Sequence, residues 1–493
     1  MENRKVFKCG ILALRDCIPT CKDESSRFHV TRWRLIRHTA HHKYGRHFTE
    51  FQIPDQRLLR YMIDTSATSV NLYDRAPSKA GRWAVPCIAI LCGISFFIGL
   101  DREPHFVDES AYVSQAYFGD LFITGSIHSP LWFEYPAYDL PPLTKYLVWS
   151  GLVTGGDPRP GPSAMRAWYS DTSKRFETAS SLRHARQPIA LCGLITVLAT
   201  GLIAQRWRGN LVAICSMILV TIHPLFRTHA RRSMADIPTE MGVALALLAF
   251  MPIVGKQKPA WRMVILGGIA TGLAASSKLN GLLAGIVLIA WALAGIDHSR
   301  KRVHGIVCML LAGIIGASLF ILLNPFFYSY PQGIKDPSLN TISEMGLLGR
   351  VKFVIDHRVG VSSQGQKSFP NDALTTIPDK AKAMVVQGFG RFSPFGPRPD
   401  DSRIRYELRQ DGSALIWLPM VLIGAVVAFR DTGNYQNGRL ILIYWICSII
   451  VVGSFLPLAW NRYYLPIVIP SIILASGGIG WAMEYLKTKL GPL

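Results

Sequence analysis

The chain has 493 residues, of which 49% are hydrophobic and only 17% are charged, and its formal net charge is +21. Soluble domains carry about 25% charged residues, so this composition excludes an ordinary soluble enzyme and indicates an integral membrane protein. No motif of a nucleic-acid-binding fold accompanies the positive charge. We therefore attribute the charge to basic loops on the cytoplasmic side of a membrane and expect no nucleic-acid partner.

The N-terminal segment 1–82 is strongly basic. It carries sixteen Lys or Arg residues against eight Asp or Glu residues. It also lacks the apolar core and the small-residue cleavage site of a signal peptide. We expect either a basic cytoplasmic tail or an assigned translation start that lies upstream of the true one. Residues 484–493 are expected to form a second, short cytoplasmic tail.

Apolar runs of about 18–20 residues are long enough to cross a bilayer. The sequence predicts such spans at 83–100, 187–205, 210–225, 238–254, 262–276, 279–296, 303–323, 413–429, 439–458 and 464–483. The predicted fold class is therefore an all-α polytopic membrane protein. It has about ten transmembrane helices between residues 83 and 483 and a large first external loop.

The distribution of Lys and Arg between the links predicts the orientation. If the basic N-terminus lies inside, the short basic links also lie inside, and the long segments 101–186 and 324–412 lie outside. Every polar motif that suggests chemistry then falls on the outer face. We expect the termini to be cytoplasmic and the active site to be external, with the bacterial inner membrane as the location.

The first external loop carries two motifs. Asp108 and Glu109 lie a few residues beyond the first span, where a carboxylate is a candidate general base. The alternative is that both residues only end the span and face water. Near the far end of the loop, Pro141 and Pro142 are followed by Lys145. Many aromatic residues lie between the two motifs. They could stack on a sugar, although packing against the bundle is expected for most of them.

Three later outer segments carry cations. They contain Arg231 and Arg232 with Asp236, then Lys278, then Arg462. Arginines on the outer face run against the positive-inside rule and suit a bound anion such as a lipid phosphate. Asp236 is equally suited to capping a helix. For Lys278, reaching the membrane interface is the common structural role, and binding a phosphate is the alternative.

This combination fits the transfer of a sugar from a polyprenyl phosphate. Cations stabilise the departing phosphate, so little acid catalysis is needed. The acceptor hydroxyl is a poor nucleophile and needs one carboxylate as a base. A single inverting displacement does not require the second carboxylate that retaining hydrolases use.

In their order along the chain, these motifs resemble the protein O-mannosyltransferase family. Its members are dolichyl-phosphate-mannose–protein mannosyltransferases of the GT-C class, and the resemblance runs from about 83 to 483. It implies that Asp108 is the base, that Glu109 supports the site, and that Lys145 and an Arg at 231 or 232 lie near the lipid phosphate.

Two departures from the family pattern matter. Thr144 stands where the family usually has Gly. The loop 324–412 is too short and too irregular for the β-trefoil domain of eukaryotic members, which favours the prokaryotic type, whose acceptor is protein, lipid or glycan.

We therefore expect an inverting transfer of a hexose, with mannose favoured, from a polyprenyl-phosphate carrier to a hydroxyl, with Ser or Thr of a secreted protein favoured. The alternatives are a transferase acting on lipid A or another envelope glycan, and a transporter whose outer charges line a path. Some members of the wider class use a divalent cation, but no ligand set here demands one, and we assign no other cofactor. The predicted roles are catalysis for Asp108 and Glu109; phosphate binding for Lys145, Arg231, Arg232, Lys278 and Arg462; and support for Asp236, Pro141 and Pro142.

Overall fold

The computed structural model describes residues 79–251, 261–279, 281, 284–294, 299–331, 334, 337–396, 412–430 and 436–490. The chain divides into two compact units, Met1–Val70 and Asn71–Leu493. The first unit lies outside the described residues, as does all of the predicted tail 1–82 except the start of the first described helix. The second unit is described below.

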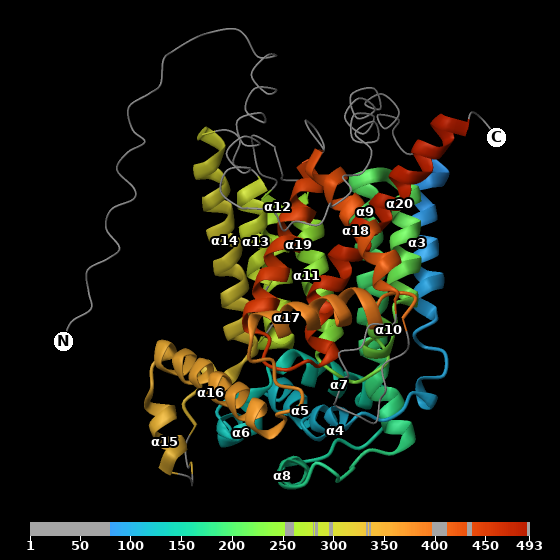
Figure 1. Cartoon of the computed structure of the whole chain (residues 1–493). Coiled ribbons are helices and arrows are strands. Elements are labelled where there is room, and N and C mark those ends of the chain that lie inside the picture. Colours follow the sequence, from blue (N-terminus) through green and yellow to red (C-terminus); the bar gives the residue numbers. More distant parts are fainter. Residues whose placement is uncertain are drawn as a thin grey trace, which may run out of the picture. The chain divides into compact units, whose positions relative to one another are not determined.

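The second unit is built on a bundle of apolar helices that pack side by side (Figure 1). Its described part contains helices and no named strand, which confirms the predicted all-α polytopic fold class. The bundle consists of α3 (Lys79–Ile94), α9 (Ala179–Ile222), α11 (Asp236–Phe250), α12 (Trp261–Ser277), α13 (Ala284–Ala294), α14 (Ser299–Leu323), α18 (Ala414–Arg430), α19 (Gln436–Phe455) and α20 (Leu465–Leu490).

By length and composition, four described helical segments can cross a membrane: Ala179–Ile222, Gly305–Leu323, Asn437–Phe455 and Asn461–Leu490. The protein is therefore a membrane protein, while the count of about ten spans stays a prediction. Two helices end furthest from their predicted last residues. Helix α3 ends at Ile94 rather than near residue 100, and Gly99 turns the chain with a φ of 66°. Helix α20 continues to Leu490, beyond the predicted end at 483.

Helix α9 is two helices joined by a sharp reversal. Arg208 and Gly209 are not helical, and Gly209 has a φ of 81°, which favours glycine. The two halves fold back on each other, because a Cβ added at Gly201 would lie 2.5 Å from Met217 Sδ. The predicted spans 187–205 and 210–225 therefore correspond to the two arms of a helical hairpin.

The remaining elements gather at one end of the bundle, the lower end in Figure 1. The loop 324–412, expected to be irregular, carries three α-helices, one 3-10 helix and one π-helix where it is described. Together the two long loops and the shorter links contain η2 (Leu100–Arg102), α4 (Val107–Ser114), α5 (Tyr117–Ile123), η3 (Pro130–Phe133), α6 (Tyr135–Asp139), α7 (Pro142–Thr154), α8 (Pro162–Ser170), α10 (Pro224–His229), η6 (Pro325–Phe327), α15 (Pro337–Glu344), α16 (Leu347–Ser368), α17 (Ile377–Ala383), the π-helix η7 (Met384–Arg391) and η9 (Asn461–Tyr464).

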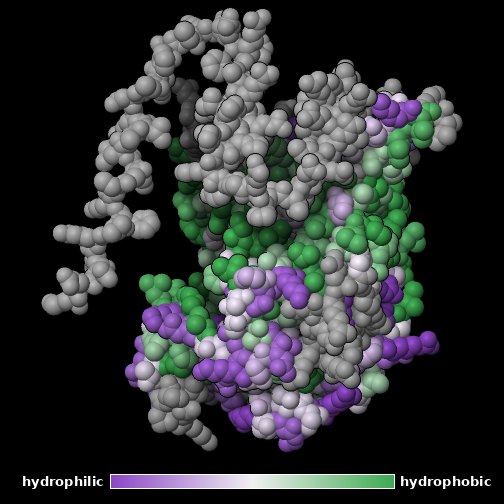
Figure 2. All heavy atoms as spheres, in the orientation of Figure 1, coloured by the Kyte–Doolittle hydropathy of each residue, from purple (hydrophilic) through white to green (hydrophobic). Residues whose placement is uncertain are grey.

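The surface of the bundle is apolar. Helix α14 exposes a row of large apolar side chains, a pattern that suits contact with lipid: Val303, Ile306, Leu310, Ile314 and Leu322. In the view of Figure 2, hydrophobic residues cover the described middle of the bundle, and hydrophilic residues gather over the end that carries the loop helices. The polar motifs of the sequence thus belong to one end of an apolar bundle.

Helices α18 and α20 cross at a contact that only glycine permits. A Cβ added at Gly424 would lie 1.7 Å from the carbonyl oxygen of Leu474, and one added at Gly478 would lie 2.4 Å from that of Met420. Backbone atoms cannot move aside as a flexible side chain can, so a side chain at this crossing would force the two helices apart.

We predict that Gly424→Leu lowers the free energy of unfolding by at least about 1–3 kcal/mol, the usual cost of overpacking. Gly285→Leu is the matched control, because a Cβ at Gly285 meets no atom within 4 Å. The measurement is the melting temperature of the purified protein in detergent. Equal melting temperatures for the two variants would contradict the close crossing.

Candidate active site

The predicted base contacts a residue from the far end of the chain. Asp108 lies in the first turn of α4, and its Oδ2 accepts a hydrogen bond from Nη1 of Arg462 in η9. The side chains of Asp108 and Arg462 are 30% and 17% exposed. Both members of this ion pair therefore remain within reach of a ligand.

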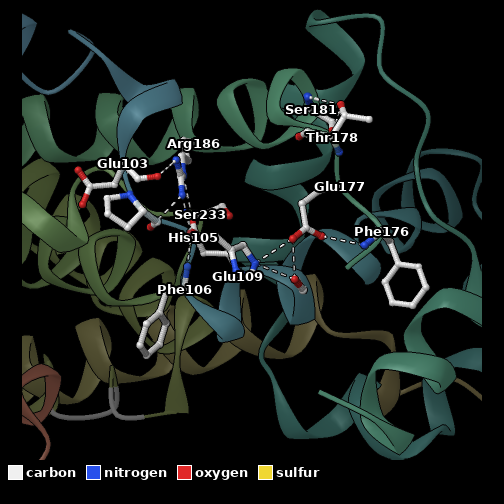
Figure 3. Close-up of polar contacts among 12 residues, drawn as sticks. Glu103, His105, Phe106, Glu109, Phe176, Glu177, Thr178, Ser181, Arg186 and Ser233 are labelled. Carbon is white, nitrogen blue, oxygen red and sulfur yellow. Dashed lines mark hydrogen bonds and ion pairs between the residues drawn. The ribbon is translucent and has the colours of Figure 1, made fainter. Parts of the chain in front are cut away.

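Glu109, by contrast, is fully buried. Arg186 of α9 donates from Nε to its Oε1 at 2.8 Å and from Nη2 to its Oε2 at 2.7 Å (Figure 3). The backbone amides of Ser233 and Phe106 add bonds of 2.8 and 3.0 Å. Burial alone would raise the pKa of Glu109. The bonds and the charge of Arg186, with the two amides, hold the pKa below the ordinary value, so the carboxyl is ionised.

Arg186 uses its remaining donors on the chain just before α4. Its Nη1 donates to the carbonyl oxygens of Leu100 and Glu103, at 2.6 and 2.8 Å. The pair of Glu109 and Arg186 thus ties η2, the start of α4 and the turn at Ser233 to α9. It fixes the backbone that carries Asp108.

Arg231 closes a second connection to the same segment. Its Nε donates to Glu103 Oε2 at 2.7 Å, and its terminal nitrogens donate to the carbonyl oxygens of Ile98 and Gly99, both at 2.6 Å. Arg232 lies over the ring of Phe106, with 4.7 Å between its Cζ and the ring centroid. Phosphate binding by Arg231 and Arg232 stays a prediction.

Asp236 lies at the start of α11, where Ala235 is the N-cap residue. Its Oδ1 accepts a hydrogen bond from Lys278 Nζ at 2.6 Å, and its Oδ2 lies 3.4 Å from Nδ1 of the buried His229. Burial lowers the pKa of His229 more than Asp236 raises it, so this imidazole is neutral at pH 7. Lys278 is 21% exposed. Asp236 and Lys278 therefore form a second ion pair with a partly open cation.

Pro141 and Pro142 begin α7, with Pro142 at the first helical position. The third residue of this helix, Thr144, donates its hydroxyl to the carbonyl oxygen of Ser277 at 3.1 Å and so joins α7 to the end of α12. Lys145 is fully buried, donates to the carbonyl oxygen of Ala137 at 2.9 Å, and lies 4.6 Å from the centroid of the Phe118 ring. Burial lowers the pKa of Lys145 to about 7. Its phosphate role stays a prediction.

Three residues near Asp108 were not identified from the sequence. Besides Arg186, these are His105 and Glu177, whose Nε2 and Oε1 atoms lie 2.8 Å apart, with Ser110 Oγ within 2.9 Å of both (Figure 3). An arginine at the start of an apolar run was a usable signal for Arg186. Nothing in the sequence pairs His105 with a residue in a loop 72 positions later.

Most aromatic residues of the first loop pack against one another, and the predicted packing role fits their burial. The cluster contains Tyr117, Phe118, Trp132, Phe133 and Tyr138, with Phe326 from the later loop. Asp139 lies 3.3 Å from Nε of Arg358 in α16 and thereby connects the two long loops. Among the described residues, no group of three or more His, Cys, Asp or Glu side chains is placed to hold a metal ion.

The fold and this site define the predicted class: an all-α membrane protein that gathers a carboxylate pair and several cations at one end of its bundle. Residues 137–329, less than half of the chain, match the model of a family described as dolichyl-phosphate-mannose-protein mannosyltransferase. The match confirms the predicted family resemblance over these residues and supports the predicted enzyme class, a membrane glycosyltransferase. No curated protein sequence matches the chain.

Several solved structures are similar over much of the chain. ArnT from Cupriavidus metallidurans in the apo state has 16% identity and a TM-score of 0.48, over 84% of this chain and 63% of ArnT. The apo oligosaccharyltransferase of Archaeoglobus fulgidus has 14% identity and a TM-score of 0.48, over 84% of this chain and 52% of its own. The S. cerevisiae Pmt1-Pmt2 complex bound to the sugar donor has 20% identity and a TM-score of 0.39, over 50% of this chain and 34% of the matched chain. This chain spans less than two thirds of each of these proteins, and TM-scores below 0.5 support no conclusion about activity.

We predict that Arg186→Met costs about 3–5 kcal/mol of stability, because it leaves the buried charge of Glu109 without its cation. The control is Glu134→Gln, which breaks an ion pair with Arg166, whose side chain is 60% exposed. Such a pair contributes at most about 1 kcal/mol. Unfolding in detergent measures the stability of both variants. A similar loss of stability in the two variants would contradict the structural role assigned to Arg186.

Glu109 also predicts a pH dependence. Its folded pKa lies below the ordinary value of 4.5, so the unfolded state binds more protons as the pH falls through that range. The contribution of Glu109 to stability is therefore complete above pH 4.5 and is lost as the pH falls toward the lowered pKa. We expect Glu109→Gln to reduce this loss of stability at acid pH. The measurement is the melting temperature between pH 3 and 7, which is roughly the range over which a carboxyl titrates.

The buried Lys145 predicts a second pH dependence, at neutral to alkaline pH. Its folded pKa of about 7 lies below the ordinary value of 10.5, so between these values the unfolded state holds more protons and stability rises with pH. We predict that Lys145→Met removes this rise in melting temperature. A surface control, Lys352→Met, leaves it intact, because the Lys352 side chain is 78% exposed. A rise that persists in Lys145→Met would contradict the assignment.

Proposed function

We propose that this protein transfers a hexose from a polyprenyl-phosphate carrier to an acceptor hydroxyl, with inversion at the anomeric carbon. The observation that carries the proposal is the partly open pair of Asp108 and Arg462, together with the partly open cation of Lys278. Each cation lies near the same ring, because the Cζ of Arg462 and the Nζ of Lys278 are 5.7 and 6.0 Å from the centroid of Tyr463.

Two partly open cations at this end suit a phosphodiester. Arg462 and Lys278 each pair with a carboxylate, Asp108 and Asp236, yet their side chains remain 17% and 21% exposed. A phosphate bound by both cations would have the charge that it gains during departure stabilised.

In the proposed reaction, Asp108 accepts the proton of the acceptor hydroxyl as its oxygen attacks the anomeric carbon. A new carbon–oxygen bond forms on one face of the sugar, and the bond from the anomeric carbon to the phosphate oxygen breaks on the other. The electron pair of that bond leaves with the polyprenyl phosphate, and Arg462 and Lys278 stabilise the added charge. Glu109 stays ionised and paired, so its role is to hold α4.

Three finer features belong to the same proposal. The description of the matched family supports mannose as the sugar and protein as the acceptor, with Ser or Thr supplying the hydroxyl. The short basic links support a site on the non-cytoplasmic face with both termini inside. Lipid A or another envelope glycan is the alternative acceptor.

We predict that Asp108→Asn lowers the transfer rate by about 10²–10⁴-fold, the usual contribution of a general base. The assay follows labelled mannose from polyprenyl-phosphate mannose in membranes, into Ser/Thr peptides and into envelope lipids separately. Asp101→Asn, an exposed acid of the same loop, is the control and keeps the rate. An unchanged transfer rate in Asp108→Asn would refute the assignment of Asp108 as the base. Label found only in lipid would support the envelope glycan as the acceptor in place of protein.

A further inference from the structure

The group proposed as the base and a cation proposed to bind phosphate are hydrogen-bonded to each other. Nη1 of Arg462 donates to Oδ2 of Asp108, and this contact joins the first long loop to η9. While it lasts, one lone pair of Oδ2 and one N–H of Nη1 are occupied, and the two charges offset each other. In the structure without ligand, the two proposed roles therefore compete for this ion pair.

Arg462 has a further donor ready for a second anion. Its Nε is buried and has no hydrogen-bond acceptor among the described residues. A buried donor of this kind costs stability unless something accepts from it. A phosphate oxygen at the Nε edge would satisfy it, since arginine binds phosphate through two neighbouring nitrogens.

The guanidinium of Arg462 has support besides Asp108. Its guanidinium lies 5.0 Å from the centroid of Trp460 and 5.7 Å from that of Tyr463, so aromatic faces hold the cation. Trp460 donates from Nε1 to Asp372 Oδ2 at 3.3 Å, and the amide of Ala459 donates to the Asp372 carbonyl oxygen at 2.8 Å. The later external loop thus fixes this aromatic support.

The other carboxylate in the cluster does not need Arg462 as its primary partner. Asp236 is paired with Lys278 at 2.6 Å. Releasing Arg462 from Asp108 therefore leaves Asp236 neutralised, and it leaves Asp108, which is 30% exposed, open to solvent and to an acceptor.

We propose that Arg462 neutralises Asp108 until the phosphate of the donor replaces Asp108 as the partner of its guanidinium. The inference rests on the proposed function and adds an order to it: donor binding frees the base, so the acceptor is activated only in the donor-loaded protein. The exchange breaks one charge-assisted hydrogen bond and forms another, which keeps it close to balance.

The test is a double-mutant cycle on the binding of polyprenyl phosphate, a probe without sugar, to the full-length protein in nanodiscs. If Asp108 and phosphate compete for Arg462, Asp108→Asn binds the probe about tenfold more tightly, a coupling of typical size for groups in contact. Arg462→Gln binds it about tenfold more weakly. In the double variant, Asp108→Asn then gives no further gain, with affinity within about twofold of Arg462→Gln alone.

Two controls make the cycle decisive. If Asp108→Asn tightened binding equally with and without Arg462, it would act only by removing a nearby negative charge, and the exchange would be refuted. Arg462→Lys, which keeps the charge and is the milder change for folding, must restore part of the coupling. A protein that does not bind polyprenyl phosphate at all would overturn the proposed function, whereas binding without coupling would overturn only the exchange.

Discussion

The buried ion pair between Glu109 and Arg186 is the constraint on which the rest of the site depends. Arg186 is 1% exposed and Glu109 is not exposed at all, so each charge is tolerated only because the other, with the surrounding amides and carbonyls, satisfies it. The pair is made between α4 and a bundle helix 77 residues later in sequence. The pair thereby fixes the position of α4, which carries Asp108 in its first turn with a partly exposed side chain.

The charged side chains at this end of the bundle fall into two groups. Arg186, Arg231 and Lys145 are buried, and their described contacts are with carboxylates, carbonyls or a ring of the protein itself. Arg462 and Lys278 also pair with carboxylates but remain partly open. A buried, fully bonded cation gives up much to bind a ligand, whereas a partly open one exchanges partners at small cost. This difference makes the second group the better candidates for a phosphate.

The proposed site is assembled by elements that also solve a packing problem. Aromatic residues of the first loop bury one another and the ring of Phe326, and Asp139 joins them to α16. The later loop, through Asp372, supports Trp460 and so the aromatic faces under Arg462. Mutations in the later loop, far from the proposed chemistry, would therefore act on the position of one guanidinium.

Composition and apolar runs determined the fold class, because a helix is the local structure that satisfies its own backbone in lipid. The motif order also identified Asp108, Glu109, Lys278 and Arg462 as candidates, since charges at the ends of apolar runs are conspicuous in sequence. The partners were decided only by the tertiary structure. The links from Asp108 to Arg462, from Glu109 to Arg186 and from His105 to Glu177 join positions far apart in the chain. Sequence periodicity reports which face of a helix is apolar, but it carries no information on which distant charge meets that end, because bundle packing sets this.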